Sequence, residues 1–69
     1  MSILADYRAL EAAVDDARRA QAAAAIRIAD AMAAGAEVEP LMLTIYRETT
    51  AAVDDARRSL DIAFPTTTA

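Results

Sequence analysis

Two pairs of adjacent aspartates, Asp15-Asp16 and Asp54-Asp55, are the residues of this sequence best suited to acid–base chemistry or metal binding. Adjacent residues of a helix point about 100° apart, so neither pair can close on one proton or one metal ion. Nearby arginines also offset their charge. The chain contains no histidine and no cysteine, which removes the commonest general base and the thiolate ligand. We therefore expect no enzyme activity, no catalytic or metal-binding residue and no cofactor.

Both aspartate pairs belong to an internal repeat with an offset of 39 residues. The eight residues Ala12–Arg19 recur unchanged as Ala51–Arg58, and a Tyr-Arg dipeptide, beginning at Tyr7 or Tyr46, precedes each copy. One interpretation is a duplicated binding surface. The other, which we favour, is that two helices solve the same packing problem, because helical repeats usually serve packing.

The elements that position this repeat are two predicted helices. No glycine or proline interrupts residues 3–34, and the only glycine, Gly35, suits the left-handed position after a helix. Pro40 suits the first turn of the next helix, and Phe64-Pro65 would end it. The sequence predicts one helical hairpin over residues 1–69, with a helix over 3–34, a loop over 35–39, a helix over 40–63 and a frayed tail over 64–69. The fold class is all-α, an antiparallel two-helix hairpin.

Apolar residues recur at alternating spacings of four and three along both predicted helices, as in a coiled coil. This seam contains Val14 and Ala17 in the first helix, together with one polar residue, Gln21, which we expect to specify register or oligomeric state. Alanine supplies 20 of the 39 hydrophobic residues, and its side chain buries little area. Two such helices leave apolar surface exposed, so we expect the hairpins to pair into a four-helix bundle, as a homodimer or a higher oligomer.

The repeat also suggests how the two helices align. With a turn centred near residue 37, residue i of the first helix would face about residue 74 − i of the second, so that Ala17 faces Ala56 and Arg57. We predict two matched charge clusters that set this register, Asp15 with Arg57 and Asp54 with Arg18.

A second apolar stripe beside the seam is positioned to receive another chain. The first helix is longer than the second, so its first turns would overhang unless the Phe64 segment folds back over them. We predict a partner interface made of this stripe and the overhang: Ile3, Leu4, Tyr7, Ala13, Ala20, Ile45 and Ala52. For Tyr7 and Tyr46, packing in the seam is the alternative that we favour.

The net charge of −4 argues against binding to nucleic acid or to an anionic membrane. The sequence does not begin with a basic region followed by an apolar stretch, and its longest uncharged tract is too short to span a bilayer. We expect a soluble cytoplasmic protein.

Residues 33–64 resemble the second half of the needle subunits and short co-chaperones of type III secretion. The similar features are Glu39-Pro40 at the end of the loop, then Leu41, Leu43 and Tyr46, and an alanine-rich helix that ends at Ile62-Ala63-Phe64. In size and two-helix design, the chain also resembles the Rop family of small plasmid RNA-binding proteins. These resemblances imply a hairpin that binds other helices, and the second adds RNA as a possible ligand.

Three functional hypotheses follow, in order of preference. The first is a non-catalytic structural or protein-interaction module that self-associates through its alanine-rich face. The second is a heterotypic adaptor, chaperone or inhibitor that offers the same face to the helices of another protein, in a secretion or phage context. The third is RNA binding of the Rop kind, by Arg18, Arg19, Arg57 and Arg58.

Overall fold

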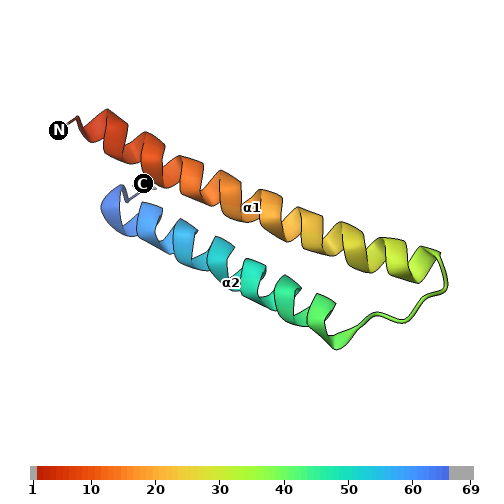
Figure 1. Ribbon diagram of the computed structural model, residues 1–69. Helices are drawn as coiled ribbons and strands as arrows, with labels where there is room; N and C mark the ends of the chain where they lie inside the picture. Colours follow the sequence, from red (N-terminus) through yellow and green to blue (C-terminus); the bar gives the residue numbers. More distant parts are fainter. Residues whose placement is uncertain (1, 66–69) are drawn as a thin grey trace.

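The protein folds as two helices that pack side by side in opposite directions (Figure 1). The computed structural model describes residues 2–65, and within them α1 spans Ile3–Ala33 and α2 spans Pro40–Ala63. The elongated body measures 50 × 26 × 17 Å. The prediction of an all-helical chain with two packed helices is confirmed. Residues 66–69 of the predicted frayed tail lie outside the described residues.

Gly35 ends α1 through a left-handed backbone conformation. Its φ angle is +69°, a region that glycine enters without the steric penalty of a Cβ atom. The Ala36 N–H donates to the Ala31 carbonyl at 2.9 Å, and the Gly35 N–H donates to the Met32 carbonyl at 3.1 Å. These two bonds form a Schellman motif, which satisfies carbonyls that the last turn would leave unpaired. α1 accordingly ends at Ala33, one residue before the end predicted from the sequence.

α2 begins at Pro40, where the missing N–H of proline leaves no helical hydrogen bond unmade. The residue before it, Glu39, is extended, as a residue preceding proline should be. At the other end, the Phe64 N–H donates to the Leu60 carbonyl at 2.8 Å, and Phe64 then leaves the helical conformation. The proline at position 65 disfavours continuation of the helix at that point.

Two side-chain contacts define the register between the helices. Gln21 Nε2 of α1 donates to Thr50 Oγ1 of α2 at 3.0 Å, and the rings of Tyr7 and Phe64 meet edge to face with centroids 5.3 Å apart. Both pairs obey the rule that residue i of α1 lies level with residue 71 − i of α2.

The predicted register of 74 − i is therefore wrong by three residues. Residues 36–39 are not helical, and the connecting segment runs back along α1 before α2 begins (Figure 1). Extended residues advance about twice as far as helical ones, so α2 starts closer to the middle of α1 than the prediction assumed. As a result, Ala17 does not face Ala56 but lies level with Val53 and Asp54.

The core between the helices is thin. Among the described residues, only Val14, Ala24 and Val53 are buried, with exposed fractions of 5%, 6% and 8%. Leu10, Ala17 and Ala56 of the seam are half-buried, whereas Tyr7 and Tyr46 are exposed. Alanine removes little apolar area from water, so a seam built largely from it stabilises the hairpin weakly.

Candidate interaction surfaces

One side of the hairpin is lined by small and apolar side chains from both helices. Ala13, Ala20 and Arg27 of α1 are spaced by seven residues, as are Ile45 and Ala52 of α2, so each set lies along one side of its helix. A surface hollow is lined by both Arg27 and Ile45, which joins the two sets on one side of the hairpin. We call this surface, defined by these five residues, the alanine face.

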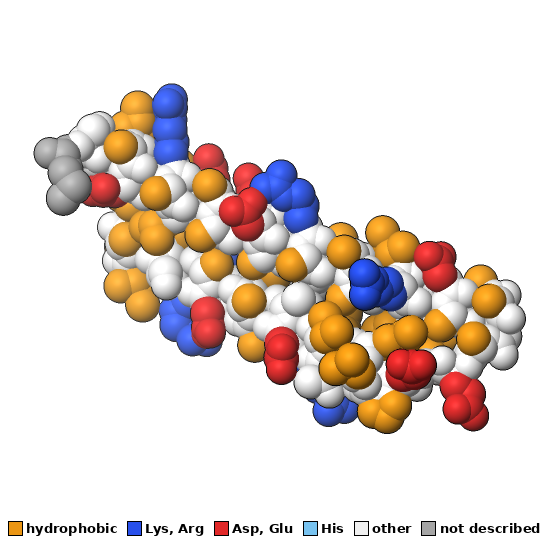
Figure 2. Space-filling model, viewed as in Figure 1, with side chains coloured by type: hydrophobic (Ala, Val, Ile, Leu, Met, Phe, Trp, Pro, Cys, Tyr) orange, Lys and Arg blue, Asp and Glu red, His pale blue; other side chains and the backbone are white. Residues whose placement is uncertain are grey.

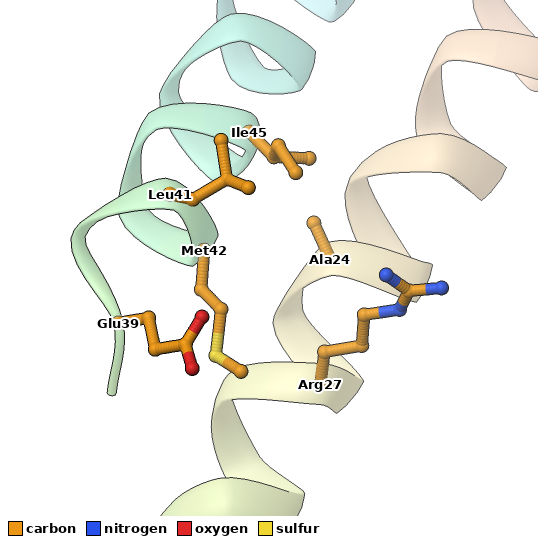
Figure 3. Close-up of a pocket in the computed structure, with 6 residues that line it drawn as sticks. All are labelled: Ala24, Arg27, Glu39, Leu41, Met42 and Ile45. Atoms are coloured by element: carbon orange, nitrogen blue, oxygen red, sulfur yellow. The ribbon is translucent and has the colours of Figure 1, made fainter. Parts of the chain in front are cut away.

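The hollow lies at the loop end of the alanine face and has a volume of about 130 Å³. Its lining comprises Ala24 and Arg27 of α1 and Glu39, Leu41, Met42 and Ile45 at the start of α2. The Met42 side chain stands between the Glu39 carboxylate and Arg27, whose guanidinium points away from that carboxylate (Figure 3). Figure 2 shows hydrophobic side chains along both helices, gathered over the first turns of α2, with charged groups more widely spaced.

The structure brings together only part of the predicted partner interface. Ala13, Ala20, Ile45 and Ala52 share the alanine face, and all four are exposed. Leu4 does not belong to it, because Leu4 and Ala13 are nine residues apart and so point to opposite sides of α1.

The predicted overhang is shorter than expected. The Tyr7 ring contacts the ring of Phe64, the residue that directly follows α2, so the end of α2 reaches the level of Tyr7. Ile3 and Leu4 lie beyond this contact and remain 74% and 56% exposed. Repulsion by the Glu11 carboxylate, one turn further along, and a hydrogen bond to it raise the pKa of Tyr7, which keeps its hydroxyl in the neutral form.

The other side of the hairpin carries charged side chains. Arg18 and Ala20 are two residues apart and so point about 160° away from each other, which places Arg18 opposite the alanine face. Here a hollow of about 280 Å³ is lined by Val14, Leu60 and five charged residues, which we call the charged face: Glu11, Asp15, Arg18, Arg57 and Asp61.

The predicted cross-helix charge clusters form only in part. Asp15, Arg18 and Arg57 line the same hollow, whereas Asp54 lines a separate one with Arg57 and Asp61. Within residues 2–65, no ion pair joins the two helices.

The ion pairs that do form are local to each helix. Arg19 pairs with Asp16, and Arg58 pairs with Asp55 at 3.2 Å, each three residues apart and largely exposed. A partner one turn away costs less side-chain entropy to reach than one on the other helix. The two helices are instead linked by the half-buried hydrogen bond between Gln21 and Thr50. Gln21 is the seam residue that we expected to specify register.

Sequence reasoning missed the hollow at the loop end, and it offers contact between Phe64 and the overhang only as an alternative. The hollow depends on how far the loop carries α2 back along α1, which residue spacing alone does not encode. In the part of the chain that the structure describes, no three acidic side chains gather as a metal site would require. Neither described helix combines the length and apolar character needed to cross a bilayer.

Comparisons with protein-family models, with curated protein sequences and with solved structures give no match to this chain.

Proposed function

We propose that this chain is a non-catalytic structural or protein-interaction module that associates with a second copy of itself through the alanine face, forming a four-helix bundle. The observation that supports this most is the imbalance between buried and exposed apolar residues. Three residues are buried between the helices, whereas ten large hydrophobic side chains of the described residues are exposed. Exposed apolar side chains that outnumber the buried ones in this way favour association with another chain.

The alanine face is the part of this surface best suited to another helix. Alanine at every second turn lets a neighbouring helix approach closely, while Ile45 and Leu41 supply the larger apolar groups at one end. Burying one large aliphatic side chain contributes about 1.5–3 kcal/mol, so burial of Ile45 and Leu41 of each copy would add several kcal/mol to the association.

The test is the association state of the purified chain, measured by sedimentation or light scattering at micromolar concentration. We expect a dimer or a higher oligomer that dissociates on dilution. Ala52→Glu should produce monomers, because it places a charge in the centre of the alanine face.

The adjacent substitution Ala51→Glu is the matched control. Residue 51 is also exposed on α2 but points about 100° away from Ala52, so this variant should associate as the parent does. A folded parent chain that is monomeric at these concentrations would overturn the proposal.

The second candidate is binding to a helix of a different protein, and it draws on the same exposed groups at the hollow, Leu41 and Ile45. A monomeric, well-folded parent chain would leave this candidate in place. We do not propose RNA binding. The charged face sets two arginines against Glu11, Asp15 and Asp61, so its net charge does not favour phosphate.

A further inference from the structure

Towards the start of α1, Asp6 extends the alanine face by one more interval of seven residues, which gives a series of four: Asp6, Ala13, Ala20 and Arg27. Residues at this spacing stay on one side of a helix, with a drift of only about 20° per interval. The series has a carboxylate at one end, a guanidinium at the other and two small residues between them. Within residues 2–65, neither Asp6 nor Arg27 takes part in an ion pair.

This order of charges is complementary to itself when reversed. If a second copy of α1 lies antiparallel on the first, with Ala13 against Ala20 of the second copy, then residue i lies level with residue 33 − i. The same alignment brings Asp6 level with Arg27 of the second copy, and the twofold axis repeats this contact at the other end. A parallel arrangement would instead set like charges against each other, which is unfavourable.

We propose, as a deepening of the self-association proposed above, that two copies dock through their alanine faces with α1 antiparallel to α1, in the register that joins Asp6 to Arg27 of the second copy. The interface is isologous, since the same patch serves both copies and the pair closes on itself. Small side chains at the centre let the helices approach, and the two charge contacts at the ends select direction and register.

The hollow at the loop end has an occupant in this arrangement. Ala24 and Arg27 line the hollow on the α1 side, and they lie level with residues 9 and 6 of the second copy. The first turns of the second copy's α1 therefore cover the hollow. These turns include Ile3, one of the most exposed large side chains of the described chain, and Asp6, whose carboxylate meets the guanidinium at the hollow's edge.

Disulfide trapping tests the register directly, because the chain has no cysteine of its own. We expect an equimolar mixture of Ala13→Cys and Ala20→Cys chains to form a disulfide-linked dimer under mild oxidation, whereas neither variant alone does so. In the proposed register, two copies of residue 13 lie seven residues apart along the interface, about 10 Å, which exceeds the reach of a disulfide of about 7 Å between Cα atoms.

The possible outcomes separate this inference from the proposed function. If Ala13→Cys links to itself, or if the mixture stays unlinked while sedimentation still shows a dimer, the register is wrong but self-association stands. If the parent chain is a folded monomer, both proposals fail. Circular dichroism on each cysteine variant shows whether its helical content is intact, so that misfolding is not mistaken for absence of docking.

Charge reversal provides a second measurement. Asp6→Arg alone and Arg27→Asp alone should each raise the dimer dissociation constant about tenfold, since each creates two like-charge contacts per dimer. The double variant Asp6→Arg/Arg27→Asp should restore the parent value, because it exchanges the ends of the same pairs. If the double variant is as weak as the single ones, Asp6 and Arg27 do not meet across the interface.

Discussion

A size exchange in the seam tests the register inside the hairpin. Val14 is buried. In the observed register it lies within one residue of the level of Ala56, a half-buried residue of α2. The register predicted from the turn position would instead put Ala17 opposite Ala56. We expect Val14→Ala and Ala56→Val to destabilise the hairpin singly and to compensate each other when combined.

The magnitudes follow from packing and helix propensity. Val14→Ala removes two buried methyl groups worth about 0.8 kcal/mol each and leaves a small cavity, while the better helix propensity of alanine returns about 0.6 kcal/mol. We expect a net loss of roughly 1–2 kcal/mol. Ala56→Val loses about 0.6 kcal/mol of propensity and adds crowding of about 1 kcal/mol. The double variant keeps one valine and one alanine at this site, so the total helix propensity and the total side-chain volume are unchanged. Its free energy of unfolding should therefore fall by less than about 1 kcal/mol.

The assay is urea unfolding followed by circular dichroism, with all variants at one chain concentration because association shifts apparent stability. Ala51→Val is the control, since residue 51 is exposed and points away from α1. It should lower the free energy of unfolding by about 0.6 kcal/mol, the difference in helix propensity between alanine and valine. Combined with Val14→Ala, its effect should be additive, without compensation. If Val14→Ala and Ala56→Val are additive within about 0.5 kcal/mol, the two side chains do not share a packing site and the register argument is wrong.

Three further predictions concern the ends of the helices. Gly35→Ala should lower the free energy of unfolding by about 1–2 kcal/mol through backbone strain alone, because the added Cβ meets no atom within 4 Å; Gly35→Asn should lower it less. Phe64→Ala should weaken the near-ultraviolet dichroism of Tyr7 and cost at least about 0.5–1.5 kcal/mol, whereas an unchanged tyrosine signal would show that the rings do not pack in solution. In a Tyr46→Phe background, spectrophotometric titration should place the pKa of Tyr7 above its usual value of 10.0, and Glu11→Gln should lower it. Because the folded chain holds this proton more tightly than the unfolded chain, stability should fall as pH rises above about 10.

The bounds of the helices could be predicted because single residues encode them. Gly35 is the residue that adopts φ of +69° without penalty, and Pro40 accepts the first helical position. The seam could be predicted as well, since the four–three spacing includes Val14 and Val53, both of which are buried. These features depend on local chemistry and on helical periodicity, which a linear pattern carries.

The relative position of the helices could not be predicted in the same way. It depends on the path of residues 36–39, whose extended backbone carries α2 back along α1 by more than the loop length suggests. A shift of three residues was enough to move Ala17 from the level of Ala56 and Arg57 to that of Asp54. The predicted Asp15–Arg57 pair forms no ion pair, although the observed register brings these two residues within one position of being level. The arginines that do pair, Arg19 and Arg58, satisfy their charge within one turn of their own helix, which no inter-helix register affects.

The two copies of the internal repeat make equivalent contacts in the two helices. They bury the equivalent residues Val14 and Val53 and form equivalent ion pairs three residues apart, as expected if the repeat serves the packing of α1 against α2.

Outside the repeat, the equivalence breaks down. The repeat equivalent of Asp6 is Ile45, so α1 carries a charge at one end of its stripe where α2 carries an apolar side chain. A partner helix can therefore distinguish α1 from α2. The repeated residues pack α1 against α2, whereas the difference between Asp6 and Ile45 should determine the direction in which a second copy docks. Asp6→Ile, which erases this difference, should leave the hairpin folded but allow more than one docking register, visible as disulfide trapping of Ala20→Cys with Ala52→Cys as well as with Ala13→Cys.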